Sequence, residues 1–197
     1  MGSFDAGPLA PAPRHVLLFS GHRVDAPGRL PPRLPPAKTG AAAAAIGAAL
    51  QSLEAGPADR AYTQGSSGGD LLFAEACLER GVAVVFLQPL PEARFIEESV
   101  RASADGDAWV RRYAAVRERL AAPPRALAPA PESAAGNVFE GCNRWLLDSA
   151  LAWGAERVRF VCLWDGDGGA GPGGTADLVA AVRRRGLPWV WLDARRL

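Results

Sequence analysis

The stretch at residues 63–89, TQGSSGGDLLFAEACLERGVAVVFLQP, joins a polar, glycine-rich loop to an apolar helix and then to an apolar strand. Residues 70–80 have a helical composition that stops at Gly81, because glycine readily takes the left-handed conformation that closes a helix. The run between Gly81 and Pro89 is continuously apolar, which is typical of a strand buried on both faces. A short strand at 59–63 precedes the loop, so strand, helix and strand follow one another here.

The same alternation continues on both sides of this stretch. Upstream we expect a buried strand at 15–21, a proline-rich ordered loop at 22–38 and a helix at 39–56, capped by Thr39. Downstream the pattern predicts helices at 91–102 and 107–122, a proline-rich connector with room for one short edge strand at 123–136, a helix at 138–153, a strand at 157–166, a helix at 175–186 and a strand at 187–193. Hairpin signals are absent. We therefore expect an α/β fold with an open, mostly parallel sheet of about five to six strands and helices on both faces.

The length and charge of the chain limit what it can be. Its 197 residues suffice for one sizeable core, so we expect a flexible tail at 1–14 and a single α/β domain at 15–197. With 22 basic and 21 acidic residues the formal charge is +1, which gives no general attraction to nucleic acid or to an anionic membrane. Any site for an anionic ligand must therefore be formed by a local group of residues and not by the net charge of the chain.

The cysteines and the apolar runs indicate the compartment. Cys77, Cys142 and Cys162 lie far apart in apolar segments and form no CxxC pair, which predicts free buried thiols in a reducing cytoplasm. No apolar run approaches the ~20 residues that span a bilayer. Residues 1–14 lack the basic start and the apolar stretch of a secretion signal. We expect a cytoplasmic protein.

The unusual loops of this chain follow its predicted strands. They read SGHRVD at 20–25, TQGSSGG at 63–69, QP at 88–89 and WDGDGGAGPGGT at 164–175. In an open parallel sheet, ligands bind outside the carboxyl ends of the strands, where these loops would form one rim. Glycines let a backbone approach a phosphate, and the free amides at a helix start favour anions.

Two glycine loops on that rim, 65–69 and 173–175, predict an anion site that Arg23, Arg29 or Arg33 would complete. A structural interpretation competes with it. Ser67 and Asp70 have the spacing of a capping box, which would use some of the amides that a phosphate needs.

Glu75 and His22 are the candidate catalytic residues. Glu75 shares a helix face with Leu71 and Leu78, so it is either a nucleophile or ribose acceptor, or it is paired with an arginine or with loop amides. His22 follows the first strand and is either an acid, a base or a phosphate donor, or a packed residue. Asp165 lies in the last glycine loop and is a further candidate for a ribose, whereas no metal-ligand spacing is present.

Three segments, FSGHRVDAPGR, QGSSGGDLLFAEACLERGVAVVFLQPLPEARFIEESV and LWDGDGGAGPGGTADLV, together resemble the Rossmann-like superfamily of the LOG phosphoribohydrolases and the DNA-processing SMF proteins (SLOG-type domains). The likeness is greatest to a bacterial branch often fused to tetratricopeptide or cyclase modules, and it covers residues 19–193 except the middle connector. It implies a Rossmann-like sheet and a signalling role in binding a nucleotide or an NAD-derived ligand. Residues 172–178 read PGGTADL, without the intervening glycine that precedes the threonine and without the closing glutamate of the hydrolase signature PGGxGTxxE. A weaker similarity, to nucleoside deoxyribosyltransferases, implies a catalytic role for Glu75.

We therefore expect a module that binds a nucleotide-derived small molecule, such as a nucleoside phosphate, ADP-ribose or an NAD-like compound, as a sensor or regulatory domain. The alternatives are an N-glycosidic-bond hydrolase or transferase with Glu75 as nucleophile or base, and a non-catalytic interaction domain. No cofactor is expected, and a homodimer or a fused or neighbouring effector module remains open. The expected ligand-binding residues are Ser20, Gly21, His22, Arg23, Gly65, Ser66, Ser67, Gly68, Gly69, Asp165, Gly166, Gly173, Gly174 and Thr175.

Overall fold

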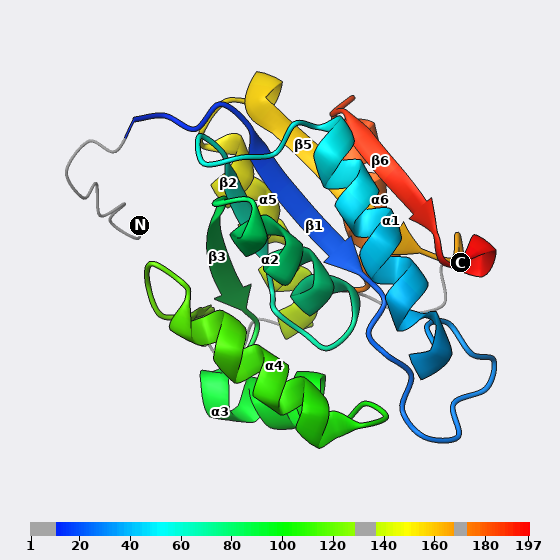
Figure 1. The fold of residues 1–197 in the computed structure, drawn as a ribbon. Helices are drawn as coiled ribbons and strands as arrows, with labels where there is room; N and C mark the ends of the chain where they lie inside the picture. Colours follow the sequence, from blue (N-terminus) through cyan, green and yellow to red (C-terminus); the bar gives the residue numbers. More distant parts are fainter. Residues whose placement is uncertain (1–10, 129–136, 168–172) are drawn as a thin grey trace.

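The computed structural model describes residues 11–128, 137–167 and 173–197, and these form one open sheet with helices on both faces (Figure 1). The strands run in the order β4-β3-β2-β1-β5-β6, and every pair of neighbours is parallel. Their bounds are β1 Val16–Gly21, β2 Arg60–Thr63, β3 Ala83–Gln88, β4 Arg125–Ala126, β5 Val158–Trp164 and β6 Trp189–Asp193. This architecture confirms the predicted Rossmann-like α/β fold, including the short edge strand in the connector.

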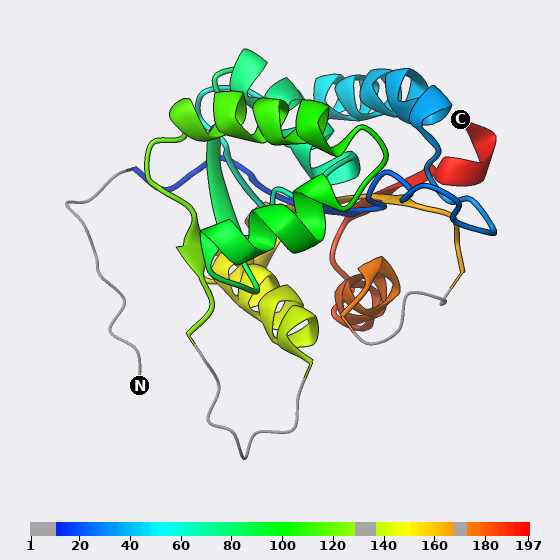
Figure 2. The ribbon, with the colours of Figure 1, turned by 90° about the horizontal axis from the view of Figure 1, so that it is seen from below.

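The helices cover the two faces of the sheet in two groups, as Figure 2 shows. Helices α1, α2 and α4 lie on one face and α5 and α6 on the other, while the short α3 leads into a π-helical segment, η2. Their bounds are α1 Thr39–Ser52, α2 Gly69–Glu79, α3 Glu92–Phe95, η2 Ile96–Arg101, α4 Gly106–Glu118, α5 Val138–Leu151 and α6 Thr175–Arg184, with 3-10 turns at Pro36–Lys38, Ala155–Arg157 and Ala194–Arg196. In the described part of the chain, no helix combines the length and the apolar character needed to cross a membrane.

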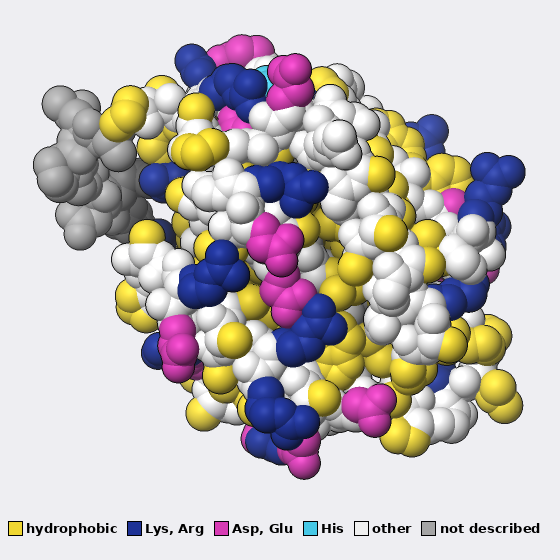
Figure 3. All heavy atoms as spheres, in the orientation of Figure 1, with side chains coloured by type: hydrophobic (Ala, Val, Ile, Leu, Met, Phe, Trp, Pro, Cys, Tyr) yellow, Lys and Arg dark blue, Asp and Glu magenta, His cyan; other side chains and the backbone are white. Residues whose placement is uncertain are grey.

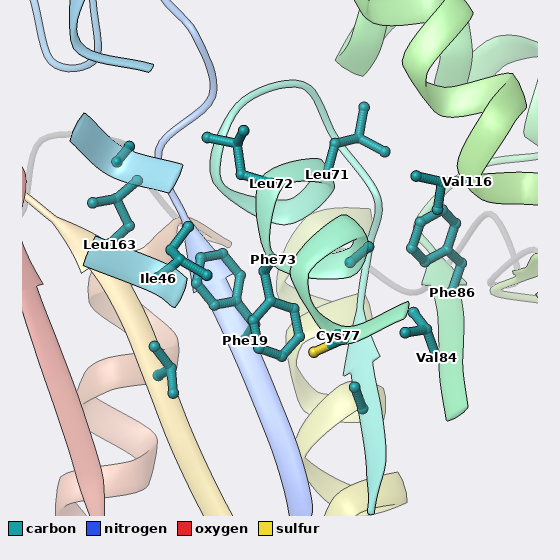
Figure 4. Close-up of a cluster of buried hydrophobic side chains, with 14 of the residues drawn as sticks. Phe19, Ile46, Leu71, Leu72, Phe73, Cys77, Val84, Phe86, Val116 and Leu163 are labelled. Atoms are coloured by element: carbon teal, nitrogen blue, oxygen red, sulfur yellow. The ribbon is translucent and has the colours of Figure 1, made fainter. Parts of the chain in front are cut away.

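Residues 16–19 of the central strand β1 are all apolar, and both faces of the strand are covered here. Leu17 and Phe19 pack into the core under α1, α2 and α4, whereas Val16 and Leu18 pack into the core under α5 and α6. The Phe19 ring stacks on Phe73 of α2 with 4.5 Å between ring centroids (Figure 4). A strand of this kind cannot show the alternation of a half-exposed strand, which explains its continuous apolar run.

The direction of the chain reverses between β1 and β5. From β1 the chain moves outward through β2 and β3 to β4, and it then returns through α5 to place β5 on the other side of β1. The two strands pair over six residues, from Val16 opposite Val158 to Gly21 opposite Leu163. At such a point the loops after the two strands diverge, and they leave room for a ligand beyond the carboxyl ends.

Several predicted boundaries differ from the structure. Thr39 is the first residue of α1 and not its cap, and its Oγ1 donates to the carbonyl of Pro36 at 2.8 Å. The predicted helix at 91–102 is divided into α3 and η2. Of the predicted tail, residues 1–10 lie outside the described part, and Arg14 is bound to the buried Asp59 through Nε and Nη2 at 3.1 and 2.9 Å. The described domain therefore begins before residue 15.

Candidate functional site

A cavity of about 470 Å³ opens at the carboxyl ends of the strands, around the end of β1. Its volume lies within the range of small-molecule sites in proteins, about 300–1,000 Å³. The structure brings to its wall the following predicted residues: Ser20, Gly21, His22, Arg23, Ser66, Gly173, Gly174 and Thr175. The wall does not include the predicted residues Gly65, Ser67, Gly68, Gly69, Glu75, Asp165 and Gly166.

His22 joins the loops that follow β1 and β5. Its Nε2 accepts a hydrogen bond from the backbone N–H of Asp165 at 3.0 Å, and the backbone N–H of His22 donates to the carbonyl of Leu163 at 2.9 Å. The side chain is 7% exposed, and this burial lowers the pKa of His22 against the opposing effect of the Asp165 carboxylate. The imidazole is therefore neutral near pH 7, with Nε2 already used as an acceptor.

Three arginines of the loop after β1 line the cavity: Arg23, Arg29 and Arg33. The Nε of Arg29 lies 3.4 Å from Oδ1 of Asp25, and the Nη1 of Arg23 donates to the carbonyl of Glu98 at 2.7 Å. Asp25 also fixes the loop itself, since its Oδ2 accepts from the backbone N–H groups of Arg33 and Leu34 at 2.9 and 3.1 Å. The loop is long and rich in proline, yet it holds its arginines in defined positions.

Asp165 lies behind this wall, between two of its residues. Its Oδ2 is 3.4 Å from Nε of Arg33, and its Oδ1 is 3.2 Å from Nε2 of His22 and accepts from the N–H of Asp167. Trp164, the last residue of β5, donates from Nε1 to the carbonyl of Asp167 at 2.9 Å. These residues position the loop after β5 and do not contact the cavity.

The glycines of the SSGG loop allow two chain segments to approach closely. Gly68 has φ +82°, and a Cβ on it would lie 2.6 Å from the backbone nitrogen of Val24. The N–H of Gly69 donates to the carbonyl of His22 at 3.0 Å. Gly65 has φ +88°, and a Cβ there would lie 2.6 Å from the Phe86 ring. The start of α2 is thus packed against the loop after β1, and its glycines permit this close approach.

The predicted capping box of Ser67 and Asp70 is wrong in register. Asp70 accepts from the backbone N–H and the Oγ of Ser66, at 3.2 and 2.8 Å. The Ser67 hydroxyl bonds instead to the hydroxyl of Ser103, and its N–H donates to the carbonyl of Ser99 at 3.1 Å. Ser66 and Asp70 consequently remain at the cavity, whereas Ser67 ties α2 to the segment after η2.

Asp70 is the carboxylate that lines the cavity beside Ser66. It is 5% exposed, and burial raises its pKa to about 6 although the hydrogen bonds from Ser66 oppose this shift. A carboxyl group with such a pKa exchanges protons near neutral pH.

Glu75 faces α4 and not the cavity. Its Oε1 and Oε2 accept from Nε and Nη2 of Arg112 at 2.8 and 2.5 Å, and the same guanidinium lies 4.5 Å from the centre of the Trp109 ring. The salt-bridge interpretation of Glu75 is therefore confirmed, and the structure does not place this residue where it could act as a nucleophile on a ligand in the cavity.

The corner at the start of α6 is held by Asn143 of α5. Its Nδ2 donates to the carbonyls of Gly173 and Gly174 at 2.9 and 3.1 Å, and its Oδ1 accepts from Nε2 of Gln64 at 3.1 Å. Across the cavity floor, the hydroxyls of Ser20 and Thr175 are 3.1 Å apart. The second glycine loop therefore reaches the cavity as predicted; its residues 168–172 lie outside the described part.

The wall also contains residues that no sequence signal predicted. Gln64, Phe139 and Asn143 come from the end of β2 and from α5, and Ser99 and Ser103 come from η2 and the turn after it. A polar residue in a helix is normally read as facing solvent, so Asn143 and Ser99 could not be recognised without the packing of their helices.

The charges on the surface, the absence of a metal-ligand cluster among the described residues and the comparisons with known proteins do not identify a ligand or a family. Basic and acidic side chains alternate over α2 and α4, whereas α1 presents small and apolar side chains without charge (Figure 3). Among the described residues, no group of three or more histidines, cysteines, aspartates or glutamates is placed to hold a metal ion. Comparisons with protein-family models and with curated proteins found no match to this chain.

Proposed function

We propose that this chain binds a nucleotide-derived small molecule in the cavity at the ends of β1 and β5, as a sensor or regulatory domain. One observation carries the proposal: three arginines, Arg23, Arg29 and Arg33, share a cavity of about 470 Å³ with the glycine corner at the start of α6. Guanidinium groups and the amino end of a helix both favour phosphate. The position between strands whose connections diverge is the usual ligand site of such sheets.

The strand order β3-β2-β1-β5-β6 is that of a Rossmann-like sheet. Membership in the superfamily of the LOG and SMF proteins is part of the proposal and rests on the resemblance of the three sequence segments. The absence of the hydrolase signature at residues 172–178 favours binding over catalysis.

Isothermal titration calorimetry with AMP, ADP-ribose, NAD and cyclic nucleotides tests the proposal directly. We expect saturable binding of at least one of them and a loss of about tenfold or more when Arg29 or Arg33 is replaced by alanine, because each replacement removes a cation from the wall. Arg111→Ala is the matched control, since Arg111 is exposed on α4 and does not line the cavity. Absence of binding to all of these compounds by folded protein would refute the proposal.

A nucleotide N-glycosidase is the second candidate function, and the position of Asp70 favours it over a purely structural role. The carboxylate that this reaction requires would be Asp70 and not Glu75, because Asp70 lines the cavity and Glu75 is paired with Arg112 outside it. Asp25 also lines the cavity, but its carboxylate is bonded to the backbone N–H groups of Arg33 and Leu34. Incubation with nucleoside monophosphates and NAD, followed by mass spectrometry for released base, tests it. Release by wild type that is lost in Asp70→Asn and kept in Glu75→Gln would support it, and no release by wild type would exclude it for these substrates.

A further inference from the structure

One side of the cavity wall presents hydroxyl and carboxylate groups beside Arg23, whose Nη1 donates to the carbonyl of Glu98. Ser66, Asp70 and Ser99 are 6%, 5% and 2% exposed, so all three are more than nine-tenths buried, and all three line the cavity. The arginines belong to a different segment, the loop after β1. The cavity therefore has two chemically distinct parts.

The Ser99 hydroxyl is available for a hydrogen bond that the described residues do not supply. Its Oγ is buried and has no hydrogen-bond partner among the described residues. Most buried hydroxyl groups in proteins are bonded, and an unsatisfied one costs about 1–3 kcal/mol. Ser99 lines the cavity although its Oγ has almost no exposed surface, so a rotation of this side chain would bring the hydroxyl to a polar group of a bound molecule.

The three side chains come from adjacent segments. The N–H of Ser67 donates to the carbonyl of Ser99 at 3.1 Å, so Ser66 directly precedes the residue that is bonded to the η2 segment. The Ser66 hydroxyl in turn donates to Oδ2 of Asp70 at 2.8 Å. Arg23 secures the same segment from the other side through its bond to the carbonyl of Glu98. The hydroxyls of Ser66 and Ser99 and the carboxylate of Asp70 thus form one patch, in which hydrogen bonds hold the η2 segment against the start of α2.

The chemistry of this patch selects a ligand group. A carboxylate accepts hydrogen bonds and repels phosphate, whereas a serine hydroxyl both donates and accepts. Neighbouring hydroxyls of a sugar match these properties, because they donate to the carboxylate and exchange hydrogen bonds with the serines. We propose that Ser66, Asp70 and Ser99 form a subsite for the ribose hydroxyls of the ligand, with its phosphate directed to Arg29 and Arg33. This inference rests on the proposed function and specifies which part of a nucleotide each side of the cavity takes.

Calorimetric titration of the full chain with AMP, 2′,3′-dideoxy-AMP, ribose 5-phosphate and inorganic phosphate tests the subsite. We expect AMP to bind at least tenfold more tightly than dideoxy-AMP. Ser99→Ala should remove most of this ratio by weakening AMP alone, and it should leave the folded protein at least as stable, because the hydroxyl has no partner to lose. Ser52→Ala, at an exposed position at the end of α1, is the matched control.

The possible outcomes separate this inference from the proposed function. Equal affinity for AMP and dideoxy-AMP, or an equal loss of both in Ser99→Ala, overturns the ribose subsite and leaves nucleotide binding standing. Binding of ribose 5-phosphate that depends on Ser99, without binding of AMP, supports the subsite and excludes AMP as the ligand. Failure of all four compounds to bind overturns the ribose subsite, and the proposed function falls with it if ADP-ribose, NAD and cyclic nucleotides also fail to bind.

Discussion

Replacement of Asp70 by asparagine should stabilise the protein above pH 6 and have little effect on stability in acid. Burial raises the pKa of Asp70 from 3.8 to about 6, so the folded state binds this proton more tightly than the unfolded chain does. The side chain is only 5% exposed, and solvent does little to reduce the cost of its charge. A difference of about two pKa units corresponds to about 3 kcal/mol of stability.

The sign of the effect follows from the direction of the shift. A group with a raised folded-state pKa contributes its full stability below its unfolded pKa, near 3.8, and this contribution is lost as the pH rises through 6. At pH 8 the charged Asp70 therefore destabilises the fold. Asparagine has the same shape and no charge, and its amide oxygen still accepts from Ser66.

Urea denaturation at pH 4.5 and pH 8 measures the difference. We expect Asp70→Asn to gain up to about 3 kcal/mol over wild type at pH 8, which for a domain of this size corresponds to a rise in Tm of about 6–12 °C. The gain should be much smaller at pH 4.5. Asp148→Asn, at an exposed position on α5, should change stability by less than about 0.5 kcal/mol at either pH. A variant that is no more stable than wild type at pH 8, or equally stabilised at both pH values, would refute the argument.

Three further substitutions test the structural roles of single residues. Glu75→Gln should cost about 1 kcal/mol in urea denaturation, because it weakens a half-exposed ion pair with Arg112, while calorimetry shows unchanged ligand affinity; a large loss of affinity would contradict its placement outside the cavity. Gly68→Ala should lower Tm far more than Gly28→Ala does. Both glycines have positive φ, but a Cβ at Gly68 would lie 2.6 Å from the Val24 backbone, whereas one at Gly28 would meet nothing within 4 Å. Equal decreases in Tm would contradict this packing. Burial raises the pKa of Asp59, but hydrogen bonds from Arg14 and from two backbone N–H groups outweigh this effect and lower the pKa below its ordinary value. The stability that wild type has over Asp59→Asn should therefore be complete above about pH 4 and should disappear as the pH falls further. A difference in Tm that does not depend on pH would show that the charge is not involved.

The fold was largely predictable from the sequence because its determinants are local. Continuous apolar runs such as the one in β3 are required where both faces of a strand are covered, and glycines such as Gly81 end helices through their own backbone freedom. The position of the site was predictable for the same reason, since the order of strands and helices determines where the loops after the strands meet.

The individual residues of the site were less predictable. The sequence shows that Glu75 lies among apolar neighbours, but an ion pair and a catalytic position give the same pattern. Only the packing of α2 on α4 shows that Glu75 forms an ion pair with Arg112. The sequence also shows that SSGG is a tight loop. Only the structure shows that the loop after β1 passes so close to Gly68 that a side chain there would contact the Val24 backbone.

The sequence by itself therefore determined the parallel α/β architecture and the rim at which its loops converge, because periodicity, turn residues and chain order act over short distances. The tertiary structure alone decided which carboxylate faces the cavity, and it brought Ser99 from η2 and Asn143 from α5 to the same wall. Such pairings depend on the rotation of one helix against another, which is set by the fit of many side chains that are distant in sequence.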